Sequence, residues 1–249
     1  MIQDLFADQP DSIPQYVGRY PLLPHPCGIG HQLQVPDGQI HYAPGFLSRD
    51  ISDRLLQILL ANDRHPQQST DWQQTDMTDI HWHTIPWRQD SVHLYGKQVP
   101  LPRLSSWHGD NDRPYTYSGL TLQPNPWNKP LDWLRDQLAA ITGIWFNSVL
   151  LNWYRSGDDH ISWHADAEAE LGQNPVIASI NLGATRRFLL RRRDNPAEKL
   201  ELSLAHGTLL VMSGALQHHW QHAVPKEKRI KESRINLTFR VIHTPVSTG

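Results

Sequence analysis

The residues of this chain best suited to chemistry are two histidines and a carboxylate in its last third, His164, Asp166 and His222. Two imidazoles and one carboxylate can hold a ferrous ion on one face and leave the opposite positions open for reactants. His164 and Asp166 are two residues apart, so an extended strand would point both side chains to the same face. Spacing leaves the third ligand open, because His218 and His219 lie close to His222. The pattern predicts a mononuclear iron centre.

A polar strand face follows this set, in the stretch from Arg234 to Arg240. Alternation places Arg234, Asn236, Thr238 and Arg240 on one face and apolar residues on the other. Such a strand either lies at an exposed sheet edge or lines a polar pocket. Unpaired buried arginines would be costly, so a pocket would have to hold an anion. A dicarboxylate that also chelates the metal would satisfy both guanidinium groups.

Composition is that of an ordinary globular chain, with 249 residues, 39% of them hydrophobic and 19% charged. No apolar run approaches the ~20 residues that span a bilayer, and the start lacks the pattern of a secretory signal. The single cysteine, Cys27, excludes an internal disulfide and disfavours a thiolate zinc site. We expect no membrane partner, and a monomer in the cytoplasm or, in a eukaryotic source, the nucleus.

Charge is unevenly distributed although the net charge is only −2. Two basic groups flank the candidate metal ligands: Arg186, Arg187, Arg191, Arg192 and Arg193, and then Lys226, Lys228, Arg229, Lys231 and Arg234. Charge runs usually form a solvated surface. Their position beside a candidate site also favours a polyanionic partner.

Turn residues and the spacing of apolar residues predict the helices and strands that must position these residues. Residues 1–30 are rich in proline and predict an irregular arm, and residues 62–90 predict a loop. Two helices are predicted, over 48–61 and 130–141, the second ended by Gly143. Extended pieces are predicted over 31–42, around a turn at 36–38, and over 92–95, 148–154, 176–182, 187–192, 199–204, 208–212 and 234–242. Many short strands with regular turns are typical of a barrel or sandwich.

Four ordered motifs resemble the iron- and 2-oxoglutarate-dependent AlkB-type nucleic-acid dioxygenases, in the branch of the human DNA-repair homologs. The similarity covers roughly residues 90 to 243. The motifs are Asn152-Trp-Tyr154 with its continuation to His164-Ala-Asp166-Ala-Glu168, Ala205-His206-Gly207, Trp220-Gln-His222-Ala-Val-Pro225, and Arg234-Ile-Asn236-Leu-Thr-Phe-Arg240.

This resemblance implies a fold and a division of the chain. It implies an α+β, β-rich fold with a double-stranded β-helix (jelly-roll) core, flanking N-terminal helices and a nucleotide-recognition hairpin region. We expect a single catalytic dioxygenase domain over 31–249, with helices and the recognition region in 31–145 and the jelly-roll core in 146–243.

The resemblance also assigns roles. It selects His222 as the third iron ligand and implies O2 as co-substrate. It implies that 2-oxoglutarate is held by Asn152, Tyr154, Arg234, Asn236 and Arg240, without deciding which arginine takes which carboxylate. It suggests that the target base is contacted by Tyr95, Tyr115, Tyr117 and Glu168. The implied activity is oxidative demethylation of 1-methyladenine and 3-methylcytosine in alkylated DNA.

Three alternatives stay open at this point. The same chemistry can act on methylated RNA or on protein. A non-catalytic β-barrel binding module can contain the same histidines. A zinc hydrolase can use the same ligands, although it has no need of two arginines that clamp a dicarboxylate.

Overall fold

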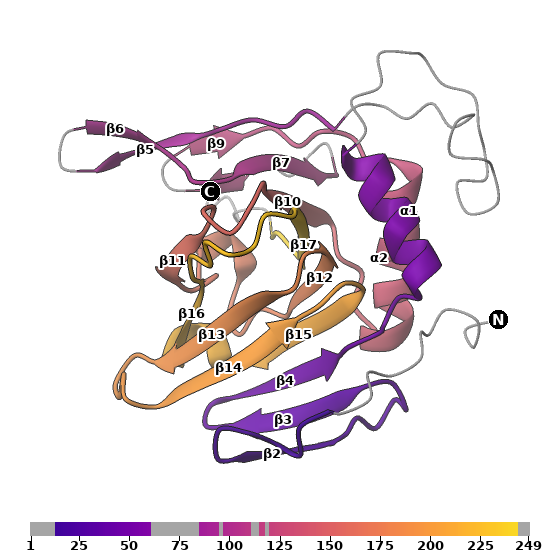
Figure 1. Ribbon diagram of the computed structural model, residues 1–249, viewed down its shortest axis with the longest axis vertical. Coiled ribbons are helices and arrows are strands. Elements are labelled where there is room, and N and C mark those ends of the chain that lie inside the picture. Colours follow the sequence, from indigo (N-terminus) through magenta and orange to yellow (C-terminus); the bar gives the residue numbers. More distant parts are fainter. Residues whose placement is uncertain (1–12, 61–84, 95–96, 111–114, 118–119, 244–249) are drawn as a thin grey trace, which may run out of the picture.

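The structure, a computed structural model, describes residues 13–60, 85–94, 97–110, 115–117 and 120–243. Two antiparallel sheets form its body (Figure 1). The larger has nine strands in the order β1 (Tyr16–Val17), β2 (Tyr20–Pro24), β3 (His31–Val35), β4 (Gly38–Ala43), β15 (Thr208–Gly214), β12 (Ile177–Gly183), β17 (Arg234–Arg240), β10 (Ser148–Tyr154) and β7 (Leu104–Gly109).

The smaller sheet has four strands in the order β11 (Ile161–His164), β16 (Trp220–Val224), β13 (Arg186–Arg192) and β14 (Lys199–Leu204). Two separate hairpins pair β5 (Ser91–Leu94) with β6 (Lys97–Pro100) and β8 (Tyr115–Tyr117) with β9 (Leu120–Leu122). The paired sheets are those of a jelly roll, as the resemblance implied. The larger sheet joins β4 and β7 to the C-terminal strands, so both parts of the predicted domain share one sheet.

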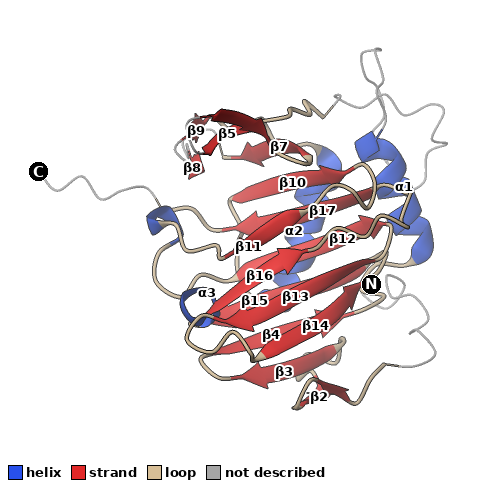
Figure 2. Ribbon diagram, turned by 60° about the vertical axis from the view of Figure 1, so that its left-hand side comes forward, coloured by secondary structure: helices blue, strands red, loops and turns tan. Residues whose placement is uncertain are grey.

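Two hydrophobic cores lie on opposite faces of the larger sheet. Helices α1 (Arg49–Leu60) and α2 (Lys129–Thr142) cover one face, as Figure 2 shows from the side. Ile235, Leu237 and Phe239 of β17 belong to that helix-covered core. Leu150 and Tyr154 of β10 belong to the other core, between the two sheets. Alternation along each strand therefore turns one set of side chains to the helices and the other to the smaller sheet.

Both helices begin and end where local chemistry satisfies their free backbone groups. Ser48 Oγ accepts a hydrogen bond from the Ile51 N–H at 3.4 Å at the start of α1. Asn128 Oδ1 accepts one from the Leu131 N–H at 3.1 Å at the start of α2. Gly143 ends α2 with a φ of 70°, which a residue without a Cβ adopts easily. Both predicted helices are confirmed, with small differences at their ends.

The irregular arm expected over residues 1–30 is wrong for residues 16–24, which form β1 and β2. Val17 and Leu22 are buried in the core between the sheets. The prolines that suggested an arm, Pro21 and Pro24, lie in β2 near the edge of the sheet, where a missing N–H is tolerated. Residues 1–12 lie outside the described part.

Short elements account for the other differences from the predicted pattern. No helix or strand was predicted for β7, β16, the helix α3 (Leu216–His219) or the 3-10 turn η2 (Ala169–Leu171). The predicted loop over 62–90 lies outside the described residues up to residue 84, and no helix or strand occurs in 85–90. Among the helices in the described ranges, none has the length and apolar character needed to cross a membrane.

Candidate active site

His164, Asp166 and His222 meet in a cavity between the two sheets, with their ligand atoms all within 4.8 Å of one another. His164 of β11 and His222 of β16 are register partners in the smaller sheet. Their ring centroids are 4.2 Å apart. The ambiguity left by spacing is thereby resolved, because His218 and His219 lie in α3 and have exposed side chains.

A β-bulge turns His164 into the cavity. Ile161 pairs with Val224 and His164 pairs with His222, so three steps along β11 oppose two along β16. On a regular strand, residues three apart face opposite sides. The additional residue restores the same side, and both Ile161 and His164 line the cavity.

Asp166 is not on a strand, contrary to the prediction that it shares one with His164. Strand β11 ends at His164, and Asp166 is held by partners distant in sequence. Its N–H donates to Gln217 Oε1 at 2.9 Å, and its Oδ1 accepts from Arg240 Nη2 at 2.8 Å. Burial alone would raise the pKa of Asp166, but the charge of Arg240 and the neighbouring histidines lower it to about 2. The carboxylate is therefore ionised and fixed in direction.

Each histidine presents a defined environment to this carboxylate. His164 Nδ1 lies 2.8 Å from the Ser162 carbonyl oxygen, so that nitrogen donates and Nε2 keeps its lone pair. Nε2 of His222 lies 3.9 Å from Asp166 Oδ2. Burial lowers the pKa of His222 to about 3, and His164 contributes in the same direction. The ring of His222 can thus offer a neutral nitrogen to a cation.

Arg234 lies at the other end of the β17 cavity face and is fully buried. Its Nη2 donates to Asn181 Oδ1, and its guanidinium lies 4.9 Å from the Tyr154 ring centre. Nε and Nη1 of Arg234 are buried without a hydrogen-bond partner among the described residues. Burial lowers the pKa of Arg234 to about 10, so it still carries its charge at neutral pH. These donors are suited to an anion.

Polar side chains connect the two ends of the cavity. Asn236 Nδ2 donates to Ser179 Oγ at 2.6 Å, and Thr238 Oγ1 donates to Asn236 Oδ1 at 2.9 Å. Arg103 Nε donates to Asn152 Oδ1 at 2.9 Å. The pocket interpretation of the Arg234–Arg240 strand is confirmed, because β17 lies inside the larger sheet and all its residues are buried.

Sequence reasoning missed several residues of this cavity. Ser179 and Asn181 alternate with apolar residues along β12, so period-two patterning could have placed them on the cavity face. Arg103 and Gln217 carry no comparable local signal. They reach the site through hydrogen bonds to Asn152 and Asp166 across 49 and 51 positions of chain.

The expected base contacts are only partly described. Glu168 follows Asp166 at the start of η2 and is not among the residues lining the cavity. Its Oε2 is buried without a hydrogen-bond partner in the described part of the chain. Tyr95 lies outside the described residues. Tyr115 and Tyr117 are in β8, but their side chains also lie outside the described part.

Much of the first basic group is paired within the protein. Arg186 is buried, with Nε 3.0 Å from Glu227 Oε2. Arg187 and Arg192 form ion pairs at 2.7 Å with Glu201 and Asp194, respectively. Arg234 belongs to the cavity. These residues therefore give little support to a polyanion-binding surface.

The sequence of this chain is similar to those of known proteins. Residues 39–240 match the family model of the 2OG-Fe(II) oxygenase superfamily. The chain is 44% identical over 168 residues to "Alpha-ketoglutarate-dependent dioxygenase alkB homolog 3" of Rattus norvegicus, covering 64% of this chain and 56% of that protein. It is 44% identical over 158 residues to "DNA oxidative demethylase ALKBH2" of Bos taurus, covering 61% and 57%.

Two further matches are less similar in sequence. "DNA oxidative demethylase ALKBH2" of Arabidopsis thaliana is 34% identical over 197 residues, covering 69% of this chain and 62% of that protein. A solved structure, "The structure of OsALKBH1", is 20% identical with a TM-score of 0.43, covering 57% of this chain and 78% of that one. The chain spans little more than half the length of the first curated relatives. Because the family match runs from β4 to the end of β17, the chain belongs to the 2OG-Fe(II) oxygenase superfamily.

Proposed function

We propose that this chain is an Fe(II)- and 2-oxoglutarate-dependent dioxygenase that removes methyl groups from N-alkylated bases in DNA. The observation that carries the proposal is one cavity with two different ends. One end gathers two histidines and an ionised carboxylate, and the other holds a buried arginine with unpaired donors. A metal chelator with a distal carboxylate fits both ends.

The donor set fits ferrous iron, with His164, Asp166 and His222 as the ligands. Two neutral imidazoles and one carboxylate are the ligands of non-haem Fe(II) oxygenases, and they leave coordination positions open. Arg240 and Gln217 hold Asp166 in place, and the Ser162 carbonyl orients His164. Such supporting contacts commonly contribute 10–100-fold to metal affinity or activity, so about that much depends on them here.

The buried donors of Arg234 fit the distal carboxylate of 2-oxoglutarate. We assign this role to Arg234 because its partners among the described residues, Asn181 and Tyr154, are neutral, whereas Arg240 already pairs with the carboxylate of Asp166. Arg240 then acts beside the metal ligand and the near carboxylate. Asn152, Tyr154 and Asn236 complete the cofactor contacts from the same cavity.

Bound iron, 2-oxoglutarate and O2 together supply oxidising power that hydroxylates an N-methyl group, with succinate, CO2 and finally formaldehyde as the products. The chain's own residues position the reactants and exclude water. The cavity beside the metal ligands is lined by the apolar side chains of Leu150, Phe188 and Met212. A base in a duplex must leave the stack to reach this site, at a cost of about a few kcal/mol that is lower for a lesion that pairs badly.

The DNA substrate is supported by the relatives named DNA oxidative demethylase, which are 34–44% identical to this chain. Tyr95, Tyr115, Tyr117 and Glu168 are proposed to contact the target base. Methyl groups on the pairing edge, as in 1-methyladenine and 3-methylcytosine, block pairing and make such bases the natural targets. We further propose that the chain acts as a monomer, in the cytoplasm or, in a eukaryotic source, the nucleus.

Formaldehyde release tests the proposal. The purified chain is incubated with Fe(II), 2-oxoglutarate and single- or double-stranded DNA and RNA oligonucleotides that carry one methylated base. We expect formaldehyde and succinate in equal amounts with methylated DNA, and none above background with unmethylated DNA. Turnover restricted to RNA or to protein would refute the substrate assignment.

A second measurement separates enzyme from binding module. Anaerobic addition of Fe(II) and 2-oxoglutarate should produce a weak visible charge-transfer band, since the keto acid chelates the iron. A folded protein that gives no band would support a non-catalytic role. Gel filtration of the free chain and of its oligonucleotide complex measures the oligomeric state.

A further inference from the structure

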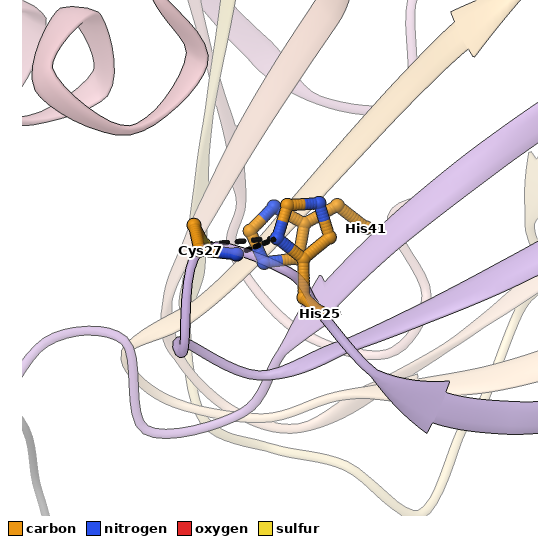
Figure 3. Close-up of side chains that lie close together, drawn as sticks. All are labelled: His25, Cys27 and His41. Carbon is orange, nitrogen blue, oxygen red and sulfur yellow. Dashed lines mark hydrogen bonds between the residues drawn. The ribbon is translucent and has the colours of Figure 1, made fainter.

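A second cluster of side chains that could hold a metal ion lies at the N-terminal strands (Figure 3). His25 and Cys27 lie in the turn between β2 and β3, and His41 lies in β4. Their potential ligand atoms are all within 4.8 Å of one another. None of the three lines the active-site cavity. The chain's only cysteine thus lies beside the stacked imidazole rings of His25 and His41.

Hydrogen bonds indicate which atoms offer lone pairs. His25 Nδ1 accepts from the Cys27 N–H at 3.2 Å, so this nitrogen is unprotonated, and it lies 2.9 Å from Cys27 Sγ. His41 Nε2 lies 2.7 Å from the Ile29 carbonyl oxygen and therefore donates to it. Its Nδ1 then keeps the lone pair, in the manner of a ligand histidine oriented by a carbonyl. A thiol and two imidazole nitrogens thus converge.

We propose that His25, Cys27 and His41 form a binding site for a thiolate-seeking divalent ion of the zinc class. One sulfur and two imidazole nitrogens are ligands that Zn²⁺ prefers, and a water molecule can take the fourth position. Binding releases the Cys27 thiol proton to solvent and forms the metal–sulfur bond, without oxidation. The sequence alone disfavoured such a site, because the chain has a single cysteine and spacing gave no indication that His25 and His41 lie beside it.

The geometry requires a small adjustment on binding. Tetrahedral zinc, about 2.3 Å from sulfur and about 2.0 Å from nitrogen, holds these ligand atoms roughly 3.5 Å apart. His25 Nδ1 and Cys27 Sγ are now 2.9 Å apart, so these two atoms must separate when an ion binds to both. The rings of His25 and His41 are stacked at 3.6 Å and must turn to bring both nitrogens in line with the ion.

The turn that carries Cys27 can supply this movement. Gly28 and Gly30 have φ values of 80° and 66°, and a Cβ at Gly28 would meet no atom within 4 Å. Cys27 itself is exposed, which gives an ion access. His41 is buried on β4 and fixes one ligand on the sheet. On binding, His25 and Cys27 in the turn would therefore move toward His41, which is fixed on the sheet.

Cobalt(II) provides a direct test because it shares zinc's ligand preferences and absorbs in the near ultraviolet when bound to thiolate. The full chain, kept reduced, is titrated with cobalt alone. Cobalt at His164, Asp166 and His222 has no sulfur ligand, so any thiolate band reports on Cys27. We expect the intensity of this band to saturate at the value for one cobalt–thiolate bond per chain. The band should disappear when zinc is added.

Three variants decide the ligand set. Cys27→Ser should abolish the band, and His25→Gln and His41→Gln should each weaken cobalt binding at this site by about tenfold or more. His218→Gln, at an exposed histidine, is the matched control and should leave the band unchanged. Circular dichroism confirms folding. Since His41 is buried, His25→Gln remains decisive if His41→Gln unfolds.

Two outcomes would overturn the proposal. One is a folded, reduced protein without a thiolate band at saturating cobalt. The other is a band that His25→Gln leaves at full affinity, which would mean that the exposed thiol binds the ion without the cluster. Neither outcome bears on turnover by the active site, because the cluster shares no residue with it.

Discussion

The two ends of β17 hold the same residue type beside different partners. Arg240 lies against Asp166, a carboxylate of the protein itself, at 2.8 Å. Arg234 contacts Asn181 and Tyr154, while its Nε and Nη1 have no partner in the described residues. At one end the guanidinium pairs with a carboxylate of the protein, and at the other its partners among the described residues are neutral side chains. The metal end is thus prepared before the co-substrate arrives, whereas the anion end stores a cost that an incoming carboxylate relieves.

The largest effect is expected at the ligand that links the metal to Arg240. Asp166→Ala should abolish formaldehyde release, because it removes the only anionic ligand of the candidate iron centre. The size-matched Asp166→Asn should behave alike and keep more of the local packing. Circular dichroism must show both variants folded. Formaldehyde release by Asp166→Ala at the wild-type rate would place the metal elsewhere.

Arg234→Met should raise the KM for 2-oxoglutarate by roughly 100-fold or more, because two charge-assisted hydrogen bonds contribute about 3 kcal/mol together. Without 2-oxoglutarate this variant should be as stable as the wild type or more stable, since an incompletely paired buried charge is removed. Thermal unfolding with and without the co-substrate measures both effects. A variant that 2-oxoglutarate still stabilises as it does the wild type would contradict the assignment.

Arg240→Met makes the same replacement at the other end of the strand, with the opposite effect on stability. Asp166 would lose its cationic partner, at a cost of about 3–5 kcal/mol even without any ligand. Turnover should fall about 10–100-fold through a misplaced metal ligand. Urea unfolding of the two arginine variants side by side gives the sign. Equal destabilisation by both would remove the distinction between the two ends.

Gln217→Leu tests the backbone support of the metal end and should act more weakly. The Asp166 N–H loses its acceptor, which costs about 1–3 kcal/mol of stability and lowers iron retention about tenfold. Gln221→Leu is the matched control, because Gln221 contacts Arg191 and not the metal ligands. Iron content after dialysis provides the measurement.

The smallest effect is expected outside the cavity. Asn128→Ala removes the cap of α2 and should cost about 1 kcal/mol of stability. The kcat and KM of the enzyme should not change. A change in the KM for 2-oxoglutarate would show that the helix layer influences the cavity face of the sheet.

Parts of the fold and of the site could be predicted where the pattern that encodes them lies in consecutive residues. Strands β10 and β14 have the predicted bounds, and β17 has the predicted faces, because alternation is written into consecutive residues. The choice of the proposed third ligand was not local, since pairing between β11 and β16 brings His222, and neither His218 nor His219, opposite His164. The partners Arg103 and Gln217 are likewise fixed only by tertiary contacts.

The strands β1 and β2 were missed for a related reason. Proline reduces the local strand signal at Pro21 and Pro24, but pairing of β2 with β3 and burial of Leu22 outweigh it. The basic group around Arg187 shows the converse case, in which a local pattern of charges is used within the molecule. Its charges suggested a partner outside the molecule, and the structure supplies carboxylates within it.

The bulge in β11 determines which side chains of this strand face the cavity. The additional residue works as a half-period phase shift that puts His164 in the cavity and leaves Trp163 beside Arg191, 4.3 Å from its guanidinium. Deleting one residue between Ile161 and His164 would remove the bulge and leave a regular strand, on which these two residues, then two positions apart, would still share the cavity face. The bulge therefore accommodates one additional residue in this segment without turning His164 away from the cavity.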